Sequence, residues 1–295
     1  KAVLSKYTGL PSNCLAITNG SYHALELIFG SLLKAGSTVL IPVPTFPFYQ
    51  KFEASRHLKI KKVACAGPND ISLINQNLNS KIKALYLANP NNPLGYILNL
   101  MDLTRLIRRA ADLKTLIVID VAYYEFSGVT AQPLLNHFSN LIIVRTMSKA
   151  FGLPGARIGY IMASAKVISG LEKLKGPAYI INHYGLGLVA RLNQSDFRRV
   201  KKYAAQINIS RNILAKKLRH VVLHIYPTAA NFLTIKVVNS DRITAALTGQ
   251  RILITNLNNY PNAHTRLKNH LRITLPLPTE LNKFNRIFHT IIKRK

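Results

Sequence analysis

The stretch LIIVRTMSKAFGLPGARIGYIM, residues 141–162, narrows the possible folds of this sequence more than any other stretch. Its two apolar runs, 141–144 and 158–162, predict two buried strands. Between them stand Ser148 and Lys149, followed by a glycine-rich turn and Arg157. A lysine at this point has two interpretations: it can mark the exposed end of a strand, or it can be a reactive amine. The rest of the sequence has to distinguish them.

Apolar strands alternate with amphipathic helices through the first 165 residues or so. SYHALELIFGSLLKAG predicts a helix that starts at Ser21 and ends at Gly36. Further strands are predicted at 38–43, 83–88 and 115–120, with a basic helix at 102–113. Continuous apolar strands separated by helices indicate an α/β fold with a mainly parallel mixed sheet that is covered by helices on both faces.

The last third of the chain has a different pattern. A long basic helix is predicted from about 196 to 220, after the glycine-containing stretch GPAYIINHYGLG. Strands near 221–226, 231–237, 252–255 and 270–275 and a final helix from Thr279 lack the strict alternation. We therefore predict a large domain at 1–180 and a smaller α+β C-terminal domain at 181–295.

Composition indicates a globular protein. The chain has 295 residues, of which 48% are hydrophobic, and its apolar runs are too short for a membrane span. Two cysteines favour a reducing compartment such as the cytoplasm, and the scattered histidines predict no metal site. The first residues, KAVLSKYTGL, read like the middle of a helix, which suggests a fragment or a processed form.

The net charge is unusual, because 40 Lys and Arg stand against 11 Asp and Glu, a formal charge of +29. Such a charge attracts nucleic acids and anionic lipids without specificity. The basic residues are dispersed, however, and no nucleic-acid-binding motif is present. We interpret the charge as a biased composition or an adaptation to an anionic substrate, and we expect neither membrane nor specific nucleic-acid binding.

Polar residues follow three predicted strands directly. ALYLA runs into NPNNPLG, LIVI runs into DVAYYEF, and LIIV runs into RTMSK. Each segment alone can be a turn, a cap or packing. Ligands bind at the carboxyl ends of parallel strands. Three strand ends that are followed by different functional groups therefore predict one ligand-binding site.

In these motifs the sequence resembles the pyridoxal-phosphate-dependent aminotransferases of the aspartate-aminotransferase fold (class I/II, PLP fold type I). It is most like the branch of histidinol-phosphate aminotransferases and threonine-phosphate decarboxylases, from about residue 7 to 290. The resemblance implies an amino-acid biosynthetic transaminase that acts as a homodimer on an amino donor and a 2-oxo acid. In such enzymes the Ser-Lys-x-Phe-Gly lysine, here Lys149, binds the aldehyde of the cofactor covalently.

The resemblance also implies roles for the other residues. Asp120 would keep the ring nitrogen of the cofactor protonated, Asn92 and Tyr123 would contact its phenolic oxygen, and Phe46 would cover its ring. The phosphate would be bound by Gly20, Ser21, the amide of Tyr22, Ser148 and Arg157. Arg272 in HLRIT, together with Asn92, would bind the substrate, and Lys149, Asp120 and Tyr123 would form the catalytic set.

The sequence departs from the family pattern at several positions. Tyr22 and His23 stand where an acidic residue is usual, Val121 replaces a glutamate and Leu94 a threonine. The N-terminal arm that reaches the partner subunit in this family is missing. Thr255 stands where both branches usually have arginine, which weakens the expectation of a phosphate-bearing substrate for either. Residues 251–274 resemble the tail of the decarboxylases as much as that of the aminotransferases, so a threonine-phosphate-type decarboxylase is an alternative. A second alternative is a non-catalytic, aminotransferase-like binding or regulatory domain.

Overall fold

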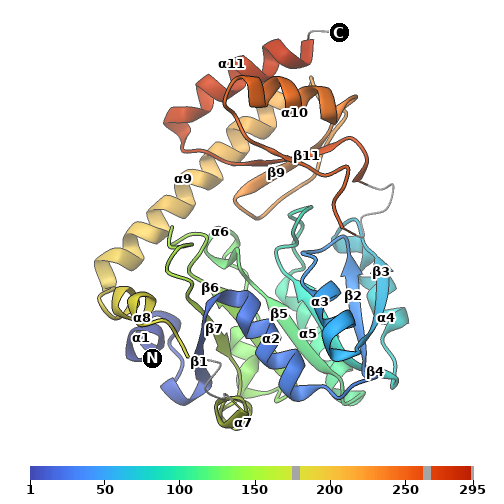
Figure 1. Cartoon of the computed structure of the whole chain (residues 1–295), viewed down its shortest axis with the longest axis vertical. Helices are drawn as coiled ribbons and strands as arrows, with labels where there is room; N and C mark the ends of the chain where they lie inside the picture. The colour runs from blue at the N-terminus through green and yellow to red at the C-terminus, as the bar shows by residue number, and fades with distance from the viewer. Residues whose placement is uncertain (175–179, 262–266, 294–295) are drawn as a thin grey trace.

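The predicted alternation of strands and helices produces a seven-stranded sheet in the lower lobe of Figure 1. This computed structural model describes residues 1–174, 180–261 and 267–293. The strands of the large sheet are β1 (Leu15–Thr18), β2 (Thr38–Val43), β3 (Lys59–Ala64), β4 (Ile82–Ala88), β5 (Leu116–Asp120), β6 (Leu141–Thr146) and β7 (Gly159–Met162).

The strand order is β1-β7-β6-β5-β4-β2-β3. Strands β2 to β6 pair in parallel, whereas β7 is antiparallel to both β6 and β1. The mainly parallel mixed sheet was therefore predicted correctly. Ala88 pairs with Asp120, and Asp120 pairs with Val144, so that β4, β5 and β6 end at one edge of the sheet.

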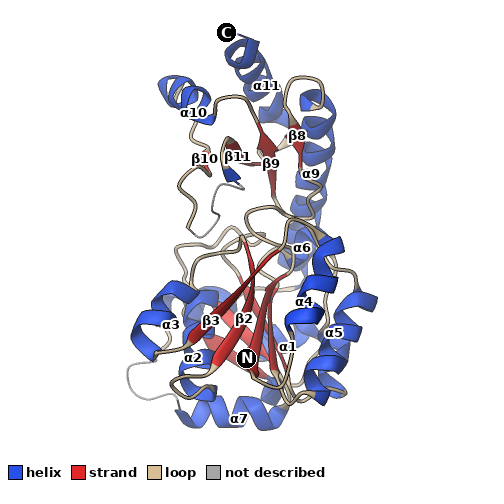
Figure 2. Ribbon diagram, turned by 90° about the vertical axis from the view of Figure 1, so that its right-hand side faces the viewer, coloured by secondary structure: helices blue, strands red, loops and turns tan. Residues whose placement is uncertain are grey.

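Helices cover both faces of this sheet, as Figure 2 shows. Successive residues of β5 point to opposite faces, because side chains alternate along a strand. Ile117 packs in the cluster that includes Leu106, whereas Val118 packs in the cluster that includes Leu25. The helices of this lobe are α1 (Ala2–Thr8), α2 (Gly20–Leu32), α3 (Tyr49–Arg56), α4 (Ile71–Asn77), α5 (Leu100–Asp112), α6 (Tyr124–Ser127) and α7 (Ala165–Leu174). Of these, α6 lies beyond the strand ends, on the side of the upper lobe. Short 3-10 turns lie at Ser12–Cys14, Pro68–Asp70 and Gln132–Asn136.

The upper lobe contains a four-stranded antiparallel sheet in the order β10-β11-β9-β8. Phe232, Leu271 and Phe288 belong to its hydrophobic core. The elements of this part of the chain are α8 (His183–Ala190), α9 (Gln194–Leu218), β8 (His224–Ile225), β9 (Phe232–Lys236), α10 (Ser240–Gly249), β10 (Thr255–Asn256), β11 (His270–Thr274) and α11 (Pro278–Lys293).

Helix α9 connects the two lobes (Figure 1). It begins where Asn193 and Asp196 form a capping box. Asn208 donates to the carbonyl of Phe126 in the lower lobe at 3.0 Å, and Lys217 donates to Asn282 of α11 at 3.1 Å. Since one continuous helix contacts both lobes, the division into residues 1–180 and 181–295 stays a prediction.

Several predicted boundaries were wrong. The helix expected to end at Gly36 ends at Leu32, because Leu33 already has an extended backbone. The strands expected at 221–226 and 252–255 shorten to two residues each, because both lie at the edges of the small sheet. Residues 176–179 of the glycine-containing stretch lie outside the described residues, and α8 begins within the remainder at His183.

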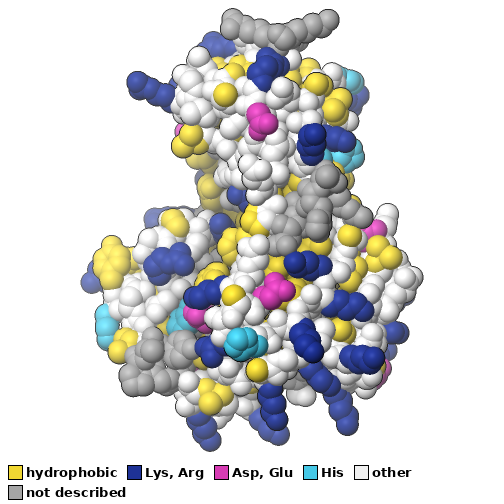
Figure 3. Space-filling model, turned by 45° about the vertical axis from the view of Figure 1, so that its right-hand side comes forward, with side chains coloured by type: hydrophobic (Ala, Val, Ile, Leu, Met, Phe, Trp, Pro, Cys, Tyr) yellow, Lys and Arg dark blue, Asp and Glu magenta, His cyan; other side chains and the backbone are white. Residues whose placement is uncertain are grey.

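Lys and Arg side chains are spread over the face shown in Figure 3. Within the described ranges, no helix is long and apolar enough to cross a membrane. Nor do three or more His, Cys, Asp or Glu side chains of that part of the chain form a possible metal site.

Candidate active site

The carboxyl ends of β4, β5 and β6 border a cavity of about 190 Å³. Asn92 follows β4, Asp120 ends β5, and Lys149 follows β6. These three segments are adjacent in the sheet, so residues far apart in the sequence line one space. The predicted residues that line it are Ser21, Tyr22, Phe46, Asn92, Asp120, Tyr123, Ser148, Lys149 and Arg157.

One wall of the cavity is the N-terminus of α2. Gly20 has a left-handed φ of 83°, and a Cβ atom there would lie 2.9 Å from an Nη atom of Arg157. A Cβ on Gly159 would lie 2.6 Å from the backbone nitrogen of Ser21, so α2 can approach β7 only because this residue is glycine. The free N–H groups of a helix N-terminus, a serine hydroxyl and an arginine together form an anion-binding site.

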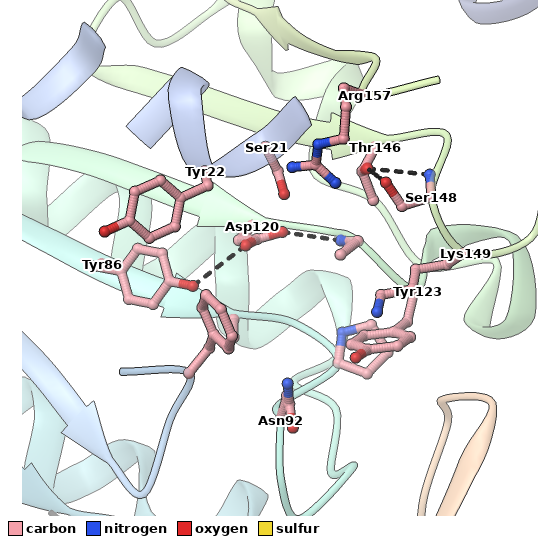
Figure 4. Close-up of a pocket in the computed structure, with 14 residues that line it drawn as sticks. Ser21, Tyr22, Tyr86, Asn92, Asp120, Tyr123, Thr146, Ser148, Lys149 and Arg157 are labelled. Atoms are coloured by element: carbon pink, nitrogen blue, oxygen red, sulfur yellow. Dashed lines mark hydrogen bonds between the residues drawn. The ribbon is translucent and has the colours of Figure 1, made fainter. Parts of the chain in front are cut away.

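The hydroxyls of Thr146 and Ser148 lie on the same side of the cavity as the start of α2 (Figure 4). The hydroxyl of Thr146 donates to Oγ of Ser148 at 3.0 Å, and the backbone N–H of Ser148 donates to Thr146 at 3.1 Å. This contact fixes the turn after β6, which also carries Lys149. Ser148 therefore lies on the same side of the cavity as Ser21 and Arg157.

Asp120 is buried at the centre of the cavity, with 8% of its surface exposed. The N–H of Ala122 donates to its Oδ1 at 3.0 Å, and the hydroxyl of Tyr86 donates to its Oδ2 at 3.3 Å. Burial raises the pKa of this carboxyl to about 6, although both hydrogen bonds and the charge of Lys149 oppose the rise. The carboxylate is therefore placed to stabilise a cationic N–H group in the cavity.

Lys149 lies across the cavity from α2, with its Nζ 5.7 Å from the ring centroid of Tyr123. Burial, followed by the charge of Arg272, lowers the pKa of the Lys149 amine. A lower pKa increases the neutral fraction, which is the form that attacks an aldehyde or accepts a proton. Tyr123 stays protonated at neutral pH, because burial raises its pKa to about 12.

Arg272 reaches the site from β11 of the upper lobe. One of its Nη groups donates to Oδ1 of Asn92 at 2.6 Å, and the other donates to Thr255 at 3.3 Å. Its guanidinium carbon lies 5.2 Å from the ring centroid of Phe232. The predicted pair Asn92 and Arg272 is thus in direct contact, and the amide nitrogen of Asn92 is left to donate elsewhere.

Two predicted residues contribute differently. Phe46 lies between β2 and α3 with 41% of its surface exposed, so its ring is available to cover a ligand. The ring of Tyr22 stacks on the ring of Phe52, with 6.5 Å between the ring centroids. The backbone of Tyr22, rather than its ring, is therefore the part of the residue at the N-terminus of α2.

The residues that depart from the family pattern pack or form hydrogen bonds within this fold. His23 accepts a hydrogen bond from the backbone N–H of Asn19 at 3.0 Å. Val121 is buried in the core beneath the sheet, and Leu94 packs with Leu257 of the upper lobe.

Five residues that line the cavity were not predicted from the sequence: Tyr86, Ala88, Pro90, Ala122 and Thr146. Tyr86 stands inside the predicted strand at 83–88, where the apolar pattern conceals its hydroxyl, whereas Thr146 follows the predicted strand at 141–144. A period of two residues could have found Tyr86, because Tyr86 and Ala88 share one face of β4.

This set of groups fits pyridoxal phosphate. The side-chain-free Gly20, the hydroxyls of Ser21 and Ser148, and Arg157 suit a phosphate. A buried carboxylate for the ring nitrogen and an amine for the aldehyde face the same cavity.

Comparison with known proteins identifies the family that the sequence motifs resemble. The model of the family "Aminotransferase class I and II" matches residues 4–284. The histidinol-phosphate aminotransferase of Caldanaerobacter subterraneus subsp. tengcongensis is 31% identical over 289 residues, which are 92% of this chain and 76% of the relative.

Solved structures share the fold. The histidinol-phosphate aminotransferase of Clostridium acetobutylicum has a TM-score of 0.84 at 20% identity, covering 100% of this chain and 88% of that one. The L-threonine-O-3-phosphate decarboxylase of Porphyromonas gingivalis has a TM-score of 0.81 at 21% identity, covering 99% and 88%. The histidinol-phosphate aminotransferase of Sinorhizobium meliloti, solved with pyridoxal-5'-phosphate, has a TM-score of 0.81 at 23% identity, covering 99% and 80%. Because the family model spans nearly the whole chain, this protein belongs to the class I and II aminotransferases and is a pyridoxal-phosphate-dependent transaminase of PLP fold type I.

Proposed function

We propose that the protein transfers the amino group of a histidinol-phosphate-like amino donor to a 2-oxo acid, with Lys149 as the catalytic base. The observation that carries the proposal is that Lys149, Asp120 and Asn92 line one cavity, with Arg272 hydrogen-bonded to Asn92. The histidinol-phosphate aminotransferases among the relatives indicate the class of amino donor.

Each residue would bind a different part of the cofactor. The phosphate would be held by Ser21, Ser148 and Arg157, together with the N–H groups at the start of α2. Asp120 would accept a hydrogen bond from the ring nitrogen, whereas Tyr123 and the amide of Asn92 would donate to the phenolic oxygen. Phe46 would cover the ring and exclude water from it.

The bound cofactor supplies an electron-withdrawing ring that weakens the bonds at the α-carbon of the substrate. Arg272 binds the carboxylate of the substrate, or the group that replaces it, through its planar guanidinium. Lys149 Nζ would remove the proton from the α-carbon of the substrate, which its lowered pKa favours.

The test of this proposal compares reactions. Histidinol phosphate and aromatic amino acids are each supplied with 2-oxoglutarate, and glutamate is measured. Phosphothreonine is supplied in parallel, and carbon dioxide is measured. We expect glutamate from at least one donor. Carbon dioxide without glutamate would replace transamination by the decarboxylase alternative.

A non-catalytic regulatory module is the alternative from another class. Its distinguishing property would be DNA binding that weakens steeply with salt, in a protein that produces neither glutamate nor carbon dioxide. The convergence of reactive groups at the cavity favours the enzyme over this alternative.

We also propose that the enzyme works in the cytoplasm as a homodimer. Ile180, which precedes α8, is 68% exposed, and Tyr184, within α8, is 74% exposed. The carbonyl of Ile180 accepts a hydrogen bond from Asn19 at the start of α2. Such an apolar surface next to the site suits a partner subunit. Sedimentation velocity should give a dimer, and an active monomer would contradict the proposal.

A further inference from the structure

Tyr86 is a buried polar residue at the cavity that the roles above leave without a function. It lies on β4 opposite Val118 of β5, whereas Asp120 lies two residues beyond Val118 on the same face. Its hydroxyl crosses from one strand to the next and donates to Oδ2 of Asp120 at 3.3 Å.

The position of this hydroxyl is determined by packing. Tyr86 has 0% of its surface exposed, and its ring lies 4.3 Å from that of Phe48 at an interplanar angle of 55°. Burial and the neighbouring Asp120 raise the pKa of Tyr86 well above its usual value. Tyr86 therefore remains protonated and remains a donor at neutral pH.

Asp120 has few other partners. Its Oδ1 accepts from the N–H of Ala122, and Lys149 and Tyr123 are the titratable groups that face it from the neighbouring segments. Without Tyr86, Oδ2 would lose the one donor that it has among the residues the structure describes.

We propose that Tyr86 is a positioning residue that orients the Asp120 carboxylate and keeps it ionised before the cofactor binds. The proposal rests on the proposed role of Asp120 toward the ring nitrogen. The consequence is that the cofactor-free enzyme already presents a negative charge to that nitrogen. Because burial opposes this charge, each donor to the carboxylate matters.

The test is a titration of Asp120 in the cofactor-free protein. Aspartates are labelled with ¹³C at the carboxyl carbon, and the Asp120 signal is assigned by its absence in Asp120→Asn. In Tyr86→Phe we expect the pKa of Asp120 to rise by about 0.5 to 1 unit, since 3.3 Å is long for a hydroxyl donor and the bond is weak.

Tyr96→Phe is the matched control. Tyr96 is also a buried tyrosine, 9% exposed, but its hydroxyl makes no hydrogen bond to Asp120. We expect the pKa of Asp120 to be unchanged in this variant.

Two titration results would overturn the proposal: an unchanged pKa in Tyr86→Phe, or an equal rise in Tyr96→Phe. A Tyr86→Phe protein that does not fold would also contradict it, because phenylalanine preserves the packing and one weak hydrogen bond does not carry the fold. Since neither substrate nor cofactor is present, the result is independent of which reaction the enzyme catalyses.

Discussion

Two hollows of this molecule contain a carboxylate, buried in one and half-buried in the other, and the reactive groups line the smaller hollow. The cavity at the strand ends measures about 190 Å³ and contains Asp120 and Lys149. A groove of about 520 Å³ between α1, α6 and α9 is lined by Tyr7, Glu125 and Phe197.

The two carboxylates differ in what they contact. Glu125 accepts a hydrogen bond from Tyr7 at 3.1 Å, and Tyr7 packs against Phe197 at 4.7 Å and Phe151 at 5.3 Å. Tyr7 and Glu125 are hydrogen-bond partners of each other, and the ring contacts of Tyr7 join α1 to the rest of the lobe. Asp120, in contrast, faces a space bordered by an amine, an amide and an anion-binding helix terminus. A ligand site is therefore identified by convergent groups with unused hydrogen-bonding capacity, and not by volume.

The comparison predicts the largest effect for Asp120→Asn. The amide keeps the shape of the side chain but no longer provides a charge for the ring nitrogen of the cofactor. We expect turnover to fall by about 10²-fold or more, as for other electrostatic groups in active sites. Cofactor retention should be affected less, because the phosphate contacts remain.

Steady-state kinetics and cofactor titration of the same Asp120→Asn preparation provide the check. Near-normal turnover would mean that Asp120, like Glu125, has only a structural role.

A smaller effect, on stability alone, is expected for Glu125→Gln. Burial, outweighing the charge of Arg145, raises the pKa of Glu125 above its usual value of 4.5. The unfolded chain therefore loses this proton at a lower pH than the folded protein does. As the pH rises from about 4.5 through the folded pKa, ionisation of Glu125 reduces the free energy of unfolding.

The glutamine variant lacks that dependence. Relative to the unmodified protein it should become more stable as the pH increases from 4.5 to 7.5, with turnover unchanged. Urea unfolding at several pH values measures the difference. A relative stability that falls over this range would show that the folded state favours ionised Glu125.

Much of the site could be predicted because strand ends are visible in the sequence. Asn92, Asp120 and Lys149 each follow an apolar run, and parallel strands bring such ends together. The parallel part of the sheet was visible for the same reason, since β2, β4, β5 and β6 are fully or almost fully buried.

The missed features lacked such a signal. Tyr86 stands inside an apolar run, and Thr146 follows one in the polar segment RTMSK. The three-dimensional structure shows that their hydroxyls bond to Asp120 and Ser148. Strand β3, with the sequence KIKKVA, lies at an edge of the sheet, where lysines are tolerated and the apolar pattern is weak. The contact of Arg272 with Asn92 joins the two lobes, which local sequence patterns do not describe.

Lys149 is the residue to which we propose that the cofactor is bound. Borohydride reduction of the cofactor-loaded protein, followed by peptide mass spectrometry, identifies the attachment residue. We expect the pyridoxyl group on Lys149 and no labelled peptide from Lys149→Ala. A label on another lysine, or a label of equal yield in Lys149→Ala, would contradict it.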